Sequence, residues 1–250
     1  GGQGEVILMR RHAPVSALPT LTNSSDMVSF VGVTKKVHAD FGSGEWDGGP
    51  IGIPFVTVPG SQPKVSVTFT WPGESDQVGY PVPANPPIEG GPDSTGDRHV
   101  LMVDRDACRL YELYATYPKT PGPGWRADSG ATWDLRSNAL RPAGWTSGDA
   151  AGLAILPGLV TYDEVAAGTV THAIRLTVPV SRKAYVWPAR HQAGSSTNAN
   201  APRMGERFRL QASVNEASFP AQARPIVRAL KTYGAIVADN GSAWFLSGAP

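Results

Sequence analysis

The chain has 250 residues, of which 17% are charged, and its 22 basic and 21 acidic side chains leave a net charge of +1. This balance, with no basic tract, argues against nucleic acid and anionic membrane surfaces as partners. A single cysteine excludes an internal disulfide and a cysteine-based zinc site. No apolar run is long enough for a transmembrane helix, so we expect no membrane insertion.

The first hundred residues predict one helix, two strands and a long loop. The capping signal Ser24-Ser25-Asp26 predicts a helix to about residue 36. Hydrophobic patterning predicts strands at residues 53–58 and 64–71. Residues 72–97 are rich in proline and glycine and lack periodicity. Because strands resume on both sides, we expect a functional surface loop there.

The centre of the chain predicts a β-hairpin with strands at residues 99–103 and 108–114. A turn centred on Arg105-Asp106 would place His99 opposite Glu112 on an apolar face that also carries Cys108, a small core residue in this interpretation. A neighbouring carboxylate raises the pKa of a histidine and fixes its tautomer. The pair therefore suits either acid/base chemistry or a buried structural contact.

The C-terminal half predicts more short strands, two helical turns and one longer helix. The helical turns are expected at residues 145–152 and 162–165, and the helix at 221–233. The signal Asp239-Asn240-Gly241-Ser242 is typical of a type I′ turn and predicts a hairpin between the strands on either side of it. Further strands are predicted at residues 131–135, 169–178, 184–187, 207–214, 235–238 and 243–246.

This pattern of short strands and regular turn signals predicts an all-β, mainly antiparallel fold. We expect a single-domain β-sandwich or jelly roll with long loops and one or two short helices. No internal repeat or internal domain boundary is evident. The predicted division is an N-terminal extension at residues 1–17 and one domain at residues 18–250.

Five segments carry a resemblance to known proteins: Ile88-Glu89-Gly90-Gly91, Gly96-Asp97-Arg98-His99, Gly144-Trp145-Thr146-Ser147, Trp187-Pro188-Ala189-Arg190-His191 and Ala238-Asp239-Asn240-Gly241-Ser242. With them the chain resembles a family of exported bacterial hypothetical proteins, mainly actinobacterial, from about Leu18 onward. Gly148 departs from the pattern, where alanine is expected. The resemblance implies a single domain and a secreted or cell-envelope location, with the signal peptide absent from this chain. It brings no established activity and no catalytic residues.

The chain lacks the standard phosphate-binding, dinucleotide-binding, nucleophile-elbow and helical zinc motifs. Carboxylates in turns and at strand ends offer a different chemistry, because glycoside hydrolysis needs two carboxyl groups in one cleft. We predict Glu89 and Glu112 as the catalytic pair, with His99 tuning Glu112. Aromatic rings and planar donors bind sugars, and the predicted substrate contacts are Arg98, Trp125, Trp145, Arg190 and His191.

The leading hypothesis is an exported glycoside hydrolase that acts on a polysaccharide, without a cofactor or a metal. One alternative is a non-catalytic carbohydrate-binding or cell-surface module. Another is a polysaccharide lyase, in which Arg98 or Arg190 neutralises a uronate and His99 or a tyrosine removes the proton. A zinc or copper site formed by His99, His172 and His191 is a further alternative. The glycan, the linkage and the oligomeric state stay open.

Overall fold

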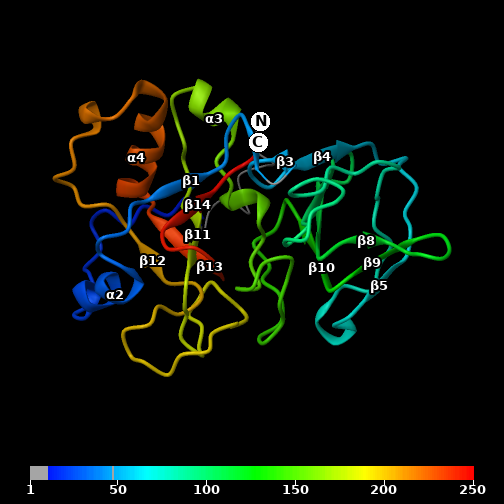
Figure 1. The fold of residues 1–250 in the computed structure, drawn as a ribbon, viewed down its shortest axis with the longest axis horizontal. Helices are drawn as coiled ribbons and strands as arrows, with labels where there is room; N and C mark the ends of the chain where they lie inside the picture. Colours follow the sequence, from blue (N-terminus) through cyan, green and yellow to red (C-terminus); the bar gives the residue numbers. More distant parts are fainter. Residues whose placement is uncertain (1–10, 47) are drawn as a thin grey trace.

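A computed structural model describes residues 11–46 and 48–250 of the chain. Within this part, strands outnumber helices and gather into two halves that lie side by side (Figure 1). One half carries the helices α2, α3 and α4 around a five-stranded sheet, and the other half is built from smaller sheets. The prediction of a β-rich chain with few short helices is confirmed. The prediction of a sandwich or jelly roll is not confirmed.

The five-stranded sheet has the order β1-β14-β11-β13-β12 and mixes parallel with antiparallel pairs. Apolar residues of β11 and β13 form its core, to which α2 adds Val31 and α4 adds Leu230. The elements of this half are α2 (Ser24–Val31), β1 (His38–Asp40), α3 (Tyr162–Ala166), β11 (Ile174–Val178), β12 (Arg207–Phe208), α4 (Arg224–Thr232), β13 (Ala235–Asn240) and β14 (Phe245–Ser247).

The other half contains a four-stranded sheet of order β10-β7-β6-β4 and a three-stranded sheet of order β5-β9-β8. Side chains alternate along β6, so Val100 and Met102 join the core shared with β5, while Leu101 packs on the opposite face. The strands are β4 (Phe55–Val58), β5 (Val67–Phe69), β6 (Val100–Asp104), β7 (Arg109–Tyr114), β8 (Tyr117–Pro118), β9 (Trp125–Ala127) and β10 (Ser129–Asp134). A small hairpin of β2 (Glu45–Trp46) and β3 (Gly49–Pro50), and single 3-10 turns at Pro72–Glu74, Leu156–Gly158, Glu216–Ser218 and Ala221–Ala223, complete the described elements.

The central hairpin forms, but its predicted register is wrong. Leu101 pairs with Glu112 in the antiparallel ladder of β6 and β7. His99 consequently lies beside Tyr114, with ring centroids 5.5 Å apart, instead of opposite Glu112. The turn spans residues 105–108, one residue further along the chain than predicted. Cys108 ends this turn with a left-handed backbone (φ 50°) and is half-buried, so its assignment as a core strand residue is also wrong.

The predicted C-terminal hairpin is wrong as well, because β11 lies between β13 and β14. The strand β13 runs parallel to one edge of β11, and β14 runs antiparallel to the other edge. Where the chain passes the end of β11, the Gly241 N–H donates to the Val178 carbonyl at 2.9 Å. The turn signal predicts the change of direction, but it cannot exclude a strand that inserts between the two arms.

Other predictions hold to different degrees. The helices predicted at residues 162–165 and 221–233 are confirmed as α3 and, after one 3-10 turn, α4. The strand predicted at 207–214 shrinks to β12, and residues 145–152 form irregular turns instead of a helix. Residues 1–10 of the predicted extension lie outside the described residues, and the proposed boundary at residue 18 stays a prediction.

A substitution at Gly130 can test the packing between the two larger sheets of the second half. A Cβ atom at this position would lie 2.6 Å from Phe69 Cε1 and 2.6 Å from the Tyr80 hydroxyl. Overpacking of this kind costs about 1–3 kcal/mol, so we expect Gly130→Ala to lower the free energy of unfolding by that amount in urea titrations. The matched control is Gly73→Ala, whose Cβ would meet nothing within 4 Å. Equal stabilities of the two variants would contradict this account of the core.

Candidate functional site

A cleft of about 530 Å³ opens where the two halves meet. Its walls come from both halves, and its floor is the irregular segment at residues 146–150. Clefts at such seams are common places for ligands to bind. The lining residues are Trp71, Glu74, Asp97, Tyr114, Ser129, Thr146, Ser147, Gly148, Asp149, Ala150, His191, Ala193, Asp239 and Asn240.

Four of the five sequence segments on which the predicted resemblance rests contribute residues to this cleft. The segments at residues 96–99, 144–147, 187–191 and 238–242 each contribute to its lining. The segment at residues 88–91 contributes Glu89, which binds His99 beside the cleft. Chain segments that are distant in the sequence therefore build one site.

A β-bulge aims Asp239 into the site. In the parallel pair of β11 and β13, Leu176 aligns with Val237 but Thr177 aligns with Asp239, so Ala238 is an extra residue. An insertion of one residue moves the following side chain to the other face of the sheet. Asp239 thereby shares a face with Arg175, whose Nη2 donates to Asp239 Oδ2 at 2.9 Å.

Arg175 binds a second carboxylate from beneath the cleft floor. Its Nη2 also donates to Asp149 Oδ1 at 3.0 Å, and its Nη1 donates to the Ser247 hydroxyl at 2.9 Å. Both Arg175 and Asp149 are buried. Burial raises the pKa of Asp239 to about 7, against the attraction of Arg175, and the negative charge of Asp149 adds to the rise. Since Asp239 is 19% exposed, its carboxyl group is a weak acid within reach of the cleft.

His99 lies next to the cleft, and both of its ring nitrogens have hydrogen-bond partners. Its Nδ1 lies 2.5 Å from Glu89 Oε2, and its Nε2 lies 2.8 Å from the Gly148 carbonyl oxygen. Burial alone would lower the pKa of His99, but the Glu89 carboxylate outweighs this and raises the pKa to about 9. The ring is thus an imidazolium that donates from both nitrogens and ties Gly148 to the residue before β6. It has no free nitrogen with which to accept a proton.

Glu112, the predicted partner of His99, lies elsewhere. Its carboxylate accepts the backbone N–H groups of Ile155 and Leu156, at 2.8 and 3.0 Å, and the indole N–H of Trp133 at 3.2 Å. Burial raises its pKa to about 7, while these donors oppose the rise. Glu112 anchors the segment that begins the 3-10 turn Leu156–Gly158. Neither Glu112 nor Glu89 lines the cleft.

Among the predicted substrate contacts, only His191 lines the cleft. Its Nδ1 lies 2.8 Å from the Ala150 carbonyl oxygen, and its Nε2 lies 3.9 Å from Glu74 Oε2. Arg98 is buried and donates to the carbonyls of Thr116, Pro92 and Ser94.

The other predicted substrate contacts also interact with groups of the protein outside the cleft lining. Arg190 donates to the Arg141 carbonyl at 2.9 Å. Trp145 lies against the Arg141 guanidinium, 5.3 Å from ring centre to Cζ, and Trp125 packs on the core between the sheets. These side chains stabilise the surroundings of the cleft instead of lining it.

The aromatic wall of the cleft is formed by Trp71 and Tyr114, which were not among the predicted contacts. Their rings stack at a centroid distance of 6.1 Å and an interplanar angle of 16°, and Trp71 is 45% exposed. In the sequence, Trp71 ends a strand in which apolar and polar residues alternate, and this position favours a tryptophan that covers the core. The signal for its exposure would have been the proline and glycine that follow it.

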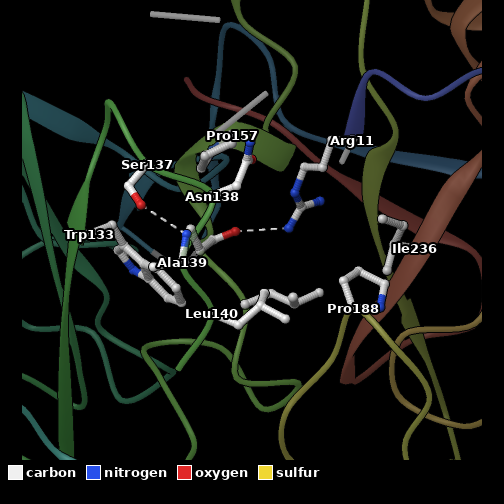
Figure 2. A pocket seen from close by; sticks show the side chains of 11 residues that line it. Arg11, Trp133, Ser137, Asn138, Ala139, Leu140, Pro157, Pro188 and Ile236 are labelled. Atoms are coloured by element: carbon white, nitrogen blue, oxygen red, sulfur yellow. Dashed lines mark hydrogen bonds between the residues drawn. The ribbon is translucent and has the colours of Figure 1, made fainter. Parts of the chain in front are cut away.

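Two other hollows are weaker candidates. The pocket in Figure 2 holds about 50 Å³ and has mostly apolar walls, and the Arg11 guanidinium in it donates to the Ala154 carbonyl at 2.8 Å. This volume is far below the roughly 300–1,000 Å³ usual for ligand sites. A groove of about 840 Å³ along residues 15–28 and 206–212 is larger, but Glu206 is the only carboxylate in its lining and is paired with Arg203.

A metal site finds limited support in the described residues. The predicted three-histidine site does not form there, because His172 pairs with Glu164 while His99 and His191 have the partners given above. The group with suitable spacing is Glu89, Asp97 and His99, whose ligand atoms lie within 4.8 Å of one another. Within this group, His99 Nδ1 is already paired with Glu89 Oε2 at 2.5 Å.

Fold and site together define a β-rich protein with an acidic, aromatic-walled cleft. Comparisons with protein-family models, with curated proteins and with solved structures found no match. Across residues 11–46 and 48–250, no helix has the length and apolarity needed to span a membrane.

The pairing of His99 with Glu89 predicts a pH dependence of stability. Because the pKa of folded His99 is about 9 and that of an unfolded histidine is about 6.5, the stabilisation is complete below pH 6.5 and is lost as the pH rises through 9. We expect the free energy of unfolding to fall by about 1–3 kcal/mol over this range in urea titrations. Glu89→Gln should flatten the slope.

The matched control is Asp93→Asn, which removes an exposed carboxylate elsewhere in the same loop. This variant should keep the wild-type slope. If Glu89→Gln shows the same slope as the wild-type protein, His99 is not the group that titrates.

Proposed function

We propose that the protein is an exported, polysaccharide-active enzyme that hydrolyses glycosidic bonds in this cleft. Asp239 acts as the general acid and Asp97 as the second carboxylate. The observation that supports this most is that Asp239 and Asp97 line one cleft, where burial raises the pKa of Asp239 to about 7. Glycoside hydrolysis requires such a division, with one carboxyl protonated and one ionised.

The surroundings of Asp239 suit a positioned acid. Arg175 holds Oδ2, and the Asn240 backbone N–H donates to Oδ1 at 2.7 Å, so the group is oriented from two sides. Asp97 is exposed, and its negative charge adds to the rise in the pKa of Asp239. The two carboxyl groups therefore lie within electrostatic reach of each other, as an acid and base pair must.

The aromatic wall supports a sugar as the ligand. A pyranose ring offers an apolar face that stacks on indole, and Trp71 is exposed toward the cleft. Tyr114 next to it has a raised pKa, first through burial and then through the charges of Asp97 and Asp239. Its neutral hydroxyl can bind a sugar hydroxyl as donor or acceptor.

In this proposal Glu89, Glu112 and His99 position the site instead of performing the chemistry. His99 and Glu89 fix Gly148 in the cleft floor, and Glu112 fixes the segment after it. The assignment of Glu89 and Glu112 as the catalytic pair stays a prediction that the same measurements test. Export, implied by the family resemblance, fits a polymeric substrate that cannot enter a cell.

The two alternatives make different demands on the site. A carbohydrate-binding module would use the Trp71 platform without needing a protonated Asp239. A uronate lyase needs a cationic side chain on the substrate carboxylate, but Arg98 and Arg190 bind backbone carbonyls outside the lining. The lyase therefore has the least support.

Substitution of the two carboxyl groups tests the assignment. We expect Asp239→Asn and Asp97→Asn each to lower kcat/KM at least about 100-fold, because each removes a proton-transfer or charge-stabilising group. The assay counts new reducing ends over a panel of neutral, amino and uronate polysaccharides, with absorbance of unsaturated products as the lyase signature. Substrate binding without products would favour the binding module.

The controls are Glu89→Gln and Glu112→Gln, compared at a temperature at which circular dichroism shows every variant folded. They should retain activity within about tenfold of the wild-type protein. The opposite pattern, with large losses in the glutamate variants and small losses in the aspartate variants, would return the catalytic role to Glu89 and Glu112.

The pH profile provides a separate test of Asp239. Because a general acid must be protonated, kcat/KM should decrease as the pH rises through about 7, the pKa of this group. We expect a single ionisation on the alkaline side in initial-rate measurements between pH 5 and 9. A rate that is constant up to pH 9 would contradict the role of Asp239 as the acid.

A further inference from the structure

The charges of the cleft point to the kind of sugar that it accepts, an inference that depends on the proposed function. Four carboxyl groups line the cleft: Glu74, Asp97, Asp149 and Asp239. No lysine or arginine is among the lining residues, and His191 is the one basic side chain there. Arg175 beneath the floor is shared between two of the carboxylates. The cleft therefore carries an excess of negative charge.

Nearby arginines are engaged by other groups and do not line the cleft. Arg141 is buried, with its guanidinium on Asp76 Oδ2 and on the carbonyls of Thr146 and Glu74. Arg98 and Arg190 are held by backbone carbonyls as described above. A substrate carboxylate or sulfate would meet negative potential here without a guanidinium to bind it.

Glu74 is the carboxylate best placed to bind a substrate cation. It lies at the end of the 3-10 turn that follows Trp71, and its side chain is 41% exposed. Oε2 accepts the Thr146 backbone N–H at 3.2 Å, which fixes the group while Oε1 has no hydrogen bond among the described residues. Its neighbour Trp71 offers a ring face, which attracts cations as well as sugar rings.

We propose that the substrate is a glycan with protonated amino groups, a polymer of hexosamine units whose nitrogen is not acylated. The ammonium group donates to Glu74 while the sugar ring stacks on Trp71. The negative cleft raises the local concentration of such a polymer and repels uronates. Glu74 acts as a specificity residue and takes no part in proton transfer.

The experiment compares glycan pairs that differ only in N-acetylation, with chitosan and chitin oligomers as the first pair and galactosamine polymers as the second. A uronate oligomer serves as the anionic member of the panel. We expect kcat/KM on the free-amine member of a pair to exceed that on its acetylated partner at least about tenfold. The difference should shrink when the salt concentration rises from 0.05 to 0.5 M, because exposed charge pairs are screened.

Glu74→Gln is the decisive variant, since its amide oxygen can still accept the Thr146 N–H. We expect KM for the free-amine glycan to rise about five- to tenfold, with kcat unchanged and with the acetylated glycan unaffected. Asp93→Asn, at an exposed carboxylate outside the lining, should change neither value. Binding of the free-amine oligomer by calorimetry gives the same comparison without turnover.

The outcomes separate the two proposals. Products from every class except free-amine glycans, or a preference for acetylated or uronate members, would overturn the substrate assignment and leave hydrolysis standing. A preference that Glu74→Gln leaves intact would overturn the role of Glu74. Absence of products and of binding over the whole panel would overturn the proposed function and the substrate class together.

Discussion

The buried guanidinium of Arg175 is the constraint on which the rest of the site depends. A charge removed from water must be paired and hydrogen-bonded, and here the partners come from three separate segments: Asp149 in the cleft floor, Asp239 in β13 and Ser247 in β14. Satisfying one cation therefore fixes the positions of all three. It also places two carboxylates on one positive charge, and burial raises the pKa of the more exposed of them, Asp239, to about 7.

A second buried cation holds the same floor from the other side. The His99 imidazolium, charged by Glu89, binds the Gly148 carbonyl, one residue before Asp149. The apolar cores of the two halves are separate clusters, so ionic and polar contacts join them at the cleft.

Local signals in the sequence predicted part of the local structure. The helical turn predicted at residues 162–165 forms as α3, where Glu164 Oε2 accepts the Thr161 backbone N–H at 3.0 Å. Hydrophobic spacing identified α4 and both strands of the central hairpin. These local signals failed to predict which segments pair, because pairing depends on residues that are distant in the sequence. A turn shifted by one residue, ended by Cys108 in a left-handed conformation, placed His99 beside Tyr114 instead of opposite Glu112. The insertion of β11 between β13 and β14 likewise depends on partners that periodicity along one strand cannot identify.

Part of the candidate site could also be predicted from the sequence. Asp239 looked like a turn residue because Asn240 and Gly241 follow it, and only the bulge at Ala238 shows that it belongs to the sheet. Arg175 carried a clearer sequence signal for the site than Asp239. An arginine within an apolar strand has to find buried acids, and aspartates in aperiodic segments are the natural partners. A search for the partners of a buried charge would have included Asp149 and Asp239, whereas a search for an isolated catalytic pair led to Glu89 and Glu112.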